Sequence, residues 1–166
     1  MATITLRGNP IQTSGELPAV GKLVPGFRLV ARDLKDVTLN DFAGKKKVLN
    51  IFPSIDTPTC ATSVRKFNQH ATAHKDVMML MISADLPFAQ GRFCGAEGLS
   101  NVVTLSMMRG RNFAKDFGVL IETGPMSGLS ARAILVLDEA NVVKHAELVK
   151  EIADEPNYEA ALKALG

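Results

Sequence analysis

Cysteine is scarce in this chain of 166 residues, in which only Cys60 and Cys94 occur. Small domains that depend on disulfides for their stability carry many more cysteines, so a disulfide-built scaffold is excluded. A chain of this length buries roughly 70% of the surface that its unfolded form exposes, which is enough for a core without cross-links. Folding therefore does not require the two thiols, and their chemistry becomes the first question.

Long apolar segments and an excess of one charge are also lacking. The longest apolar run covers residues 77–82, whereas a membrane-spanning helix needs about 20 such residues. The first residues lack the basic and apolar regions of a secretory signal, so we expect a cytoplasmic protein with reduced thiols and no membrane partner. The 19 basic residues nearly balance the 17 acidic ones, which argues against nucleic acid as a partner.

Internal repeats, low-complexity tracts and long linkers are absent as well. Together with the length, this predicts a single domain over residues 1–166. Near its start, turn residues 8–10 separate two short extended segments, which predicts an N-terminal β-hairpin within residues 1–14. A connector rich in glycine and proline follows, and alternation over residues 27–31 predicts the next strand.

The rest of the chain alternates between strand and helix patterns. Residues 38–42 are predicted as a strand end that runs into a helical turn. Buried strands are predicted at 48–52 and 77–82, and a third strand at 101–105. Helices are predicted at 58–74, 88–97, 111–117 and 157–165, and a strand hairpin at 131–137 and 142–148. Gly98 and Gly118 are placed to end the second and third helices. This order is typical of an α/β fold with a central mixed sheet and helices on both faces.

Cys60 has a position that favours chemistry. It follows a strand that ends at Pro53 and lies in the first turn of a helix that begins near Pro58, because proline is favoured at the first helical position. Asp56 or Thr57 can cap this helix. Unpaired backbone N–H groups and the positive end of the helix dipole then face the sulfur and favour its thiolate. The alternative is a small buried side chain at a helix start.

Cys94 lies in the next predicted helix. Its spacing from Cys60 matches neither a Cys-x-x-Cys redox pair nor a zinc site. A disulfide needs Cα atoms about 5.5 Å apart, whereas the axes of packed helices are about 8–10 Å apart. We therefore expect the two cysteines to be unbonded in the reduced fold, so that joining them requires local unfolding. An ordinary buried cysteine remains the alternative for Cys94.

Residues 50–68 resemble the peroxidatic segment of the peroxiredoxins, with the family pattern Pro-x-x-x-Thr-x-x-Cys at Pro53, Thr57 and Cys60. The resemblance implies that Cys60 attacks a peroxide as a thiolate and becomes a sulfenic acid. It also implies that the Thr57 hydroxyl hydrogen-bonds the thiolate and the peroxide, since a hydroxyl donates and accepts at once. Pro53 would shield the site from water.

Two further segments extend this resemblance over essentially the whole chain. Residues 83–94 resemble the resolving-cysteine segment of one subfamily, the bacterial thiol peroxidases, and residues 130–133 resemble the segment with the family's active-site arginine. The resemblance implies that Arg132 stays charged, stabilises the thiolate and binds the peroxide. It implies that Cys94 condenses with the sulfenic acid to form an intramolecular disulfide, which a thioredoxin-type dithiol reduces.

The resemblance thus implies a thioredoxin-like fold and a peroxidase that needs no metal, haem or flavin. Its substrates would be hydrogen peroxide and alkyl or lipid hydroperoxides, its reductant thioredoxin or a similar dithiol, and its assembly a homodimer. Two other functions stay open. A peroxide sensor that passes its disulfide to another protein would use the same residues. A chaperone-like binding protein would carry two incidental thiols, and substituting them would leave its function intact.

Overall fold

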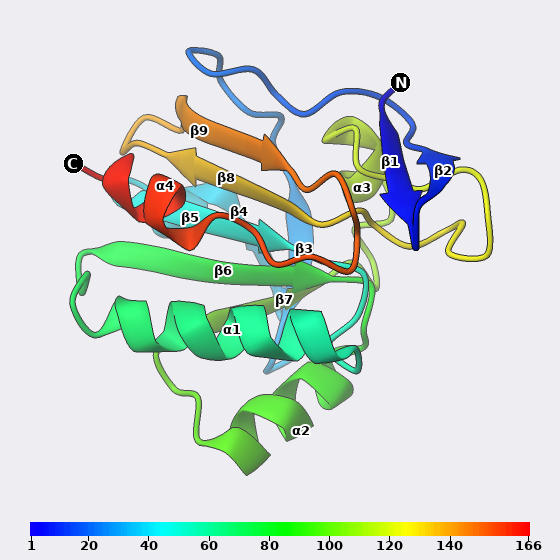
Figure 1. The fold of residues 1–166 in the computed structure, drawn as a ribbon. Helices are drawn as coiled ribbons and strands as arrows, with labels where there is room; N and C mark the ends of the chain where they lie inside the picture. Colours follow the sequence, from blue (N-terminus) through cyan, green and yellow to red (C-terminus); the bar gives the residue numbers. More distant parts are fainter.

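Seven of the nine strands form one mixed sheet in the computed structural model, which describes residues 1–166 (Figure 1). The strands are β1 (Thr3–Leu6), β2 (Asn9–Gln12), β3 (Arg28–Ala31), β4 (Asp36–Thr38), β5 (Lys46–Ile51), β6 (Val77–Ser83), β7 (Val103–Ser106), β8 (Ala133–Leu137) and β9 (Val143–Leu148). The helices are the 3-10 helix η1 (Leu39–Phe42) and the α-helices α1 (Pro58–Ala71), α2 (Pro87–Glu97), α3 (Phe113–Asp116) and α4 (Tyr158–Lys163).

The strand order in the sheet is β4-β3-β7-β6-β5-β8-β9, and β1 and β2 form a separate antiparallel hairpin. Strands β5, β6 and β7 are parallel, with α1 and α2 as the crossover connections, while β8 pairs antiparallel with β5. The parallel register places Ile51 opposite Ile82, so the carboxyl ends of β5 and β6 lie side by side. The loops that leave these two ends therefore meet at one edge of the sheet.

Apolar side chains cover both faces of the sheet and form two core clusters. One cluster joins α1 and α4 to the face that carries Val48, Met79 and Ile134. The other joins α3 and the N-terminal hairpin to the opposite face. The predicted mixed sheet with flanking helices and an N-terminal hairpin is thus confirmed. No helix combines the length and the apolar composition that crossing a bilayer requires.

The predicted ends of the elements differ from the observed ones by a few residues. Helix α1 ends at Ala71 rather than at residue 74, because Thr72, Ala73 and His74 bond to carbonyls only three residues earlier, as in successive turns. The strand predicted at 101–105 begins at Val103. Gly118 follows α3 as predicted, with a φ of 72°, and a Cβ there would lie 2.1 Å from the Glu16 carbonyl oxygen, so only glycine fits.

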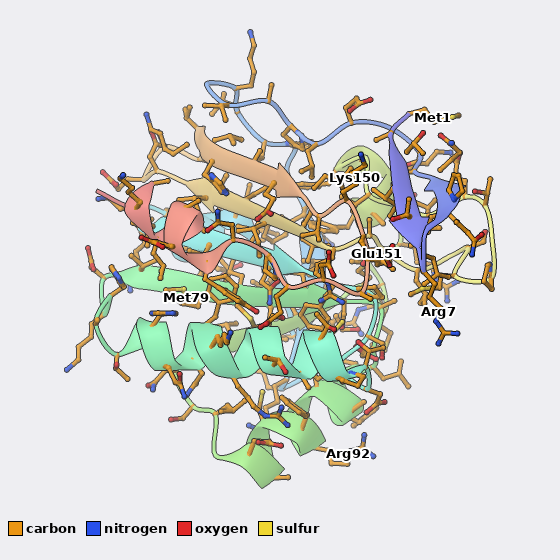
Figure 2. The ribbon with its side chains drawn as sticks, in the orientation of Figure 1. Met1, Arg7, Met79, Arg92, Lys150 and Glu151 are labelled. Carbon is orange, nitrogen blue, oxygen red and sulfur yellow. The ribbon has the colours of Figure 1, made fainter.

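Glu151 ties the N-terminal hairpin to the segment that follows β9 (Figure 2). Its carboxylate accepts hydrogen bonds from the Thr5 hydroxyl at 2.6 Å and from the backbone N–H groups of Arg7 and Gly8 at 2.9 and 3.1 Å. Mainly because of the Thr5 hydroxyl, the pKa of Glu151 is lowered to about 2. The backbone of Thr5 also forms hydrogen bonds with Lys150 and Ile152, so the N-terminal hairpin and the segment after β9 are held together.

Replacing Glu151 with glutamine should lower the free energy of unfolding at neutral pH, because an amide cannot accept these three hydrogen bonds as an anion does. The folded pKa of about 2 lies below the unfolded value of about 4.3. The stabilisation is therefore fully present above about pH 5 and is lost as the pH falls toward 2. Urea unfolding between neutral pH and about pH 3 should show a shrinking difference between wild type and Glu151→Gln.

The matched control is Glu122→Gln, since the exposed Glu122 carboxylate accepts no hydrogen bond. This control should follow the wild type at every pH. A difference between Glu151→Gln and wild type that stays constant over this pH range would contradict the ionic role of Glu151.

Candidate active site

Cys60 is the third residue of α1 and is completely buried. Residues 52–57, here called the Cys60 loop, connect β5 to α1. Pro58 begins this helix as predicted. The Cys60 sulfur accepts a hydrogen bond from Nη1 of Arg132 at 3.3 Å. The sulfur thus lies at a helix N-terminus and against a guanidinium, two features that favour negative charge.

Arg132 is brought to this sulfur by strand pairing. Ala133 of β8 lies opposite Ile51 of β5, so the residue just before β8 lies beside the end of β5, where the Cys60 loop begins. Arg132 is only 2% exposed, and its Nε donates to the Ile152 carbonyl at 3.0 Å. Burial by itself disfavours a thiolate, whereas a fixed cation in contact favours it. Arg132 is the group that can stabilise charge on this buried sulfur.

Thr57 occupies the N-cap position of α1 with an extended backbone, but its hydroxyl does not cap the helix. The hydroxyl instead donates to the Ser54 carbonyl at 2.9 Å. The Asp56 side chain is exposed and pairs with Arg92 at 3.2 Å, so the expectation that Asp56 or Thr57 caps this helix through its side chain is wrong. Because neither side chain occupies them, backbone N–H groups of the first turn remain available near Cys60. Pro53 is buried in the same loop.

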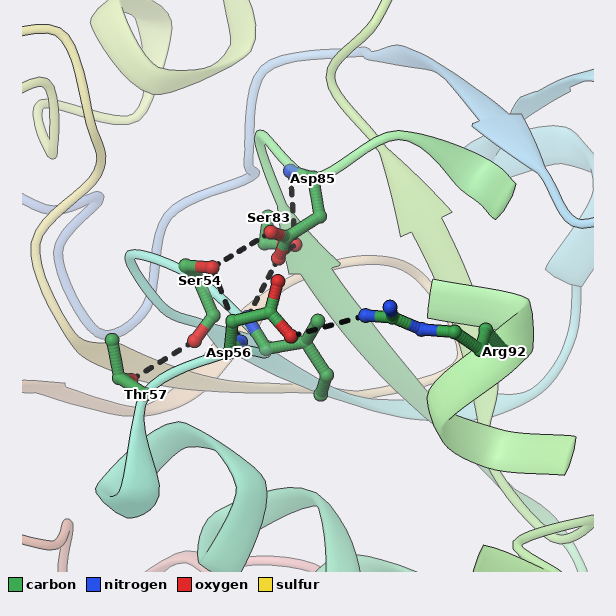
Figure 3. Close-up of polar contacts among 7 residues, drawn as sticks. Ser54, Asp56, Thr57, Ser83, Asp85 and Arg92 are labelled. Atoms are coloured by element: carbon green, nitrogen blue, oxygen red, sulfur yellow. Dashed lines mark hydrogen bonds and ion pairs between the residues drawn. The ribbon is translucent and has the colours of Figure 1, made fainter. Parts of the chain in front are cut away.

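The Cys60 loop is held by Asp85, a residue that follows β6 (Figure 3). Its carboxylate accepts hydrogen bonds from the Ser54 hydroxyl and the Ile55 backbone N–H, both at 2.7 Å. Sequence reasoning did not single out Asp85, although it lies within the segment 83–94. The usable signal was topological, since ligands and functional side chains in α/β sheets gather where neighbouring parallel strands end.

Cys94 is buried in α2, and both cysteines are free thiols, as expected for the reduced fold. Burial raises the pKa of Cys94, and the nearby charge of Arg32 offsets part of this effect. Arg32 reaches the helix because α2 carries two glycines on this side: a Cβ at Gly91 would lie 3.1 Å from its Nε, and one at Gly95 would lie 3.4 Å from its Nη2. Cys94 is therefore a neutral thiol near neutral pH.

Tyr158 is a second residue near the site that sequence reasoning missed. It begins α4, packs edge-on against Phe67 at 5.3 Å and donates its hydroxyl to Glu155 at 2.9 Å. Burial and Glu155 raise the pKa of Tyr158, and the charge of Cys60 adds to this effect. Lys66 completes the group by pairing with Glu155 at 3.1 Å. The only tyrosine of the chain thus lies close to the reactive sulfur, with no local sequence pattern to reveal it.

Metal ligands are not grouped in this structure. No set of three or more His, Cys, Asp or Glu side chains is arranged to hold an ion. His70 lies in α1, which ends at Ala71, so His74 lies outside the helix. The two imidazoles therefore do not share the helical spacing that a two-histidine site uses.

The Redoxin family matches residues 19–162. A thiol peroxidase from Mycobacterium bovis is 57% identical over all 166 residues, which cover 99% of that protein. This chain belongs to the thiol peroxidases of the redoxin family. The family predicted from the motifs around Cys60, Cys94 and Arg132 is thus confirmed.

Solved structures of the redoxin family agree with this membership. A peroxiredoxin-like protein from Aquifex aeolicus superposes with a TM-score of 0.92 at 36% identity, over 99% of this chain and 96% of that one. A thiol peroxidase from Chromobacterium violaceum superposes with a TM-score of 0.89 at 28% identity, over 98% and 94% of the two chains. These matches confirm the predicted fold of the thiol peroxidase family.

Replacing Arg132 with methionine should decrease the fraction of Cys60 that is ionised at neutral pH by about tenfold, because a cation in contact with a buried sulfur is lost. The measurement is thiolate absorbance near 240 nm during a pH titration, in a Cys94→Ser background in which only one thiol titrates. Arg65→Met is the matched control, because Arg65 pairs with Glu97 on the surface. Equal thiolate fractions with and without Arg132 would contradict its electrostatic role.

Proposed function

We propose that this protein reduces peroxides with Cys60 as the nucleophile, and that its substrates are hydrogen peroxide and alkyl or lipid hydroperoxides. The observation that carries the proposal is the 3.3 Å hydrogen bond from the buried Arg132 guanidinium to the Cys60 sulfur at the start of α1. An ionised thiol is the reactive form of cysteine, and this contact favours it. Membership of the thiol peroxidases supports the same reaction.

In the first step, the Cys60 thiolate attacks the terminal peroxide oxygen and the O–O bond breaks. The sulfur becomes a sulfenic acid, and the other oxygen leaves as an alkoxide or hydroxide that takes up a proton. The Thr57 hydroxyl donates its own proton to the Ser54 carbonyl, so its lone pairs are free to accept a hydrogen bond from the peroxide O–H. This arrangement orients the peroxide over the sulfur.

Arg132 also stabilises the charge that moves onto the leaving oxygen. Its Nε and Nη1 are used by the Ile152 carbonyl and the Cys60 sulfur, which leaves the N–H groups of Nη2 to donate to the peroxide. A donor aimed at developing charge in a site with little water contributes more than the same donor in solvent. The buried Pro53 keeps water away from the reacting atoms.

In the second step, the Cys94 thiol condenses with the Cys60 sulfenic acid, which forms the disulfide and releases one water. Both cysteines are buried and lie in different helices, so the condensation follows local opening of the Cys60 loop or of α2. A thioredoxin-type dithiol then exchanges with the disulfide and restores both thiols. From the family resemblance we also propose that the protein acts as a homodimer in the cytoplasm.

Intact mass provides a direct test of the two steps. Reduced wild type treated with one equivalent of peroxide should lose about two mass units as the disulfide forms. Cys94→Ser should instead gain about sixteen, as a sulfenic acid. Cys60→Ser is the control and should not change. Unchanged masses in wild type and in Cys94→Ser would falsify the mechanism.

Turnover separates the peroxidase from a peroxide sensor. A peroxidase should consume many equivalents of peroxide when thioredoxin, thioredoxin reductase and NADPH are supplied. A sensor would form its disulfide once and pass it to a partner, so its NADPH consumption would stop after about one equivalent. A chaperone-like protein would keep its function in Cys60→Ser, and that result would exclude a redox role.

Replacing Thr57 with valine should slow oxidation of Cys60 by about 10²-fold, because valine has no hydroxyl to accept from the peroxide. Thr57→Ser keeps the hydroxyl and should remain within a few fold of wild type. The rate is measured as sulfenic acid formation in the Cys94→Ser background. Thiolate absorbance should be unchanged in both variants, which separates peroxide binding from thiol ionisation. A normal rate in Thr57→Val would exclude this role.

A further inference from the structure

The Asp85 carboxylate joins the loop before Cys60 to the start of the segment that carries Cys94 (Figure 3). On the loop side it accepts from the Ser54 hydroxyl and the Ile55 N–H, both at 2.7 Å. On the other side it accepts from the Ser83 hydroxyl at 2.6 Å. One half-buried carboxylate thus accepts three hydrogen bonds from two different segments.

The Ser83 side of this arrangement continues into α2. The Ser83 hydroxyl accepts a hydrogen bond at 3.0 Å from the side-chain amide of Gln90, which lies in α2. Gln90 is buried and also donates to the Leu105 carbonyl at 3.0 Å. Cys94 follows Gln90 by one helical turn. The position of the Cys94 helix is therefore linked to Asp85 through two side chains.

The Ser54 side continues to the reactive end of the loop. The Ser54 carbonyl accepts the Thr57 hydroxyl at 2.9 Å, and the Ser54 hydroxyl accepts the Asp56 N–H at 3.2 Å. Ile55, whose N–H bonds to Asp85, is buried at the same point. Asp85 thus fixes the segment that places Thr57 at the start of α1.

Two ion pairs also connect α2 with the Cys60 loop and with α1, but they are weaker than the hydrogen bonds to Asp85. Asp56 pairs with Arg92 at 3.2 Å, with both side chains mostly exposed, and Arg65 pairs with Glu97 at 2.8 Å on the surface. Exposed ion pairs contribute little, because water and salt screen them. Hydrogen bonds to an ionised carboxylate away from bulk water are about twice as strong as neutral ones. Compared with these two ion pairs, Asp85 is therefore the stronger connection between the Cys60 loop and the segment that leads into α2.

We propose that Asp85 is a positioning residue that holds the Cys60 loop and α2 together in the reduced enzyme and so controls the fate of the Cys60 sulfenic acid. The proposal deepens the proposed function and rests on it. Asp85 touches neither the sulfur of Cys60 nor that of Cys94 in this structure, so it acts through Ser54, Ser83 and Gln90.

The sulfenic acid has two competing fates. After the segments separate, the Cys94 thiol forms the disulfide and releases one water. While they stay together, the ionised sulfenic acid attacks a second peroxide, whose O–O bond breaks to give a sulfinic acid and an alcohol or water. A weaker connection at Asp85 favours opening, so a larger share of the sulfenic acid becomes disulfide. The ratio of the two products therefore reports on Asp85.

The test replaces Asp85 with asparagine, which has nearly the same shape but no charge. Reduced protein is treated with increasing hydrogen peroxide, and intact mass separates the disulfide from the sulfinic acid, which is about 32 mass units heavier than the thiol. The ratio of disulfide to sulfinic acid at a given peroxide concentration should rise about tenfold in Asp85→Asn. Hydrogen exchange of residues 53–61 and 87–97 in the reduced protein should accelerate together.

Two matched controls separate this role from general destabilisation. Asp56→Asn removes the neighbouring exposed carboxylate, and Asp138→Asn removes a carboxylate that accepts two backbone hydrogen bonds in the turn between β8 and β9. Both should keep the wild-type product ratio. If Asp85→Asn does not fold, Ser54→Ala removes one of the three hydrogen bonds to the Asp85 carboxylate, together with the bond from the Asp56 N–H, and should raise the ratio by a smaller factor.

The failure of this inference is distinct from failure of the proposed function. Wild type that forms a disulfide, together with an unchanged ratio in Asp85→Asn or Ser54→Ala, would overturn the inference alone. Exchange that accelerates in only one of the two segments would also overturn it, because the coupling would then be absent. Wild type that forms no disulfide at all would overturn both.

Discussion

The Arg132 guanidinium and the Cys60 sulfur lie 3.3 Å apart inside this protein, and the arrangement of the other site residues depends on this contact. A buried sulfur resists ionisation unless a cation accompanies it, and a buried cation needs acceptors of its own. Arg132 has two: the Cys60 sulfur and the Ile152 carbonyl. The pairing of β8 with β5 and the attachment of residues 150–152 to the N-terminal hairpin keep both acceptors in place.

The two cysteines are each accompanied by an arginine, but the two arrangements differ in strength. The guanidinium of Arg132 is buried and bonds directly to Cys60, whereas Arg32 is exposed and reaches α2 across two glycines. Its charge only partly offsets the effect of burial, which raises the pKa of Cys94. The difference suits the proposed division of labour, in which Cys60 attacks as an anion and Cys94 stays a thiol until the fold opens.

The sequence was informative where chemistry depends on local order along the chain. The strand, loop and first helical turn around Cys60 are contiguous, so the spacing of Pro53, Thr57 and Cys60 predicts their placement. The family motif adds Arg132, which lies 72 residues away and which no period or turn rule connects to Cys60. Helix ends were less accurate, because helices fray at their ends, and residues 72–74 form turns through hydrogen bonds to carbonyls three residues earlier.

Acceptors and donors from distant segments could not be read from the sequence. Asp85 meets Ser54, and Tyr158 meets Phe67, only when strands and helices pack, and neither residue carries a local signature. The Ile152 carbonyl belongs to the backbone, so the identity of residue 152 does not predict that it accepts a hydrogen bond from Arg132. The capping expectation failed because the Thr57 hydroxyl donates to the Ser54 carbonyl and the Asp56 carboxylate pairs with Arg92, and propensities include neither partner.

The order of the segments along the chain also determines when the site is completed during protein synthesis. During synthesis the chain leaves the ribosome from its N-terminus, so Cys60 and α1 emerge well before Arg132, Ile152 and the segment that Glu151 ties to the hairpin. The nascent thiol lacks its cation until β8 pairs with β5. In the proposed mechanism, Cys60 therefore becomes reactive toward peroxides only once Arg132 is in place.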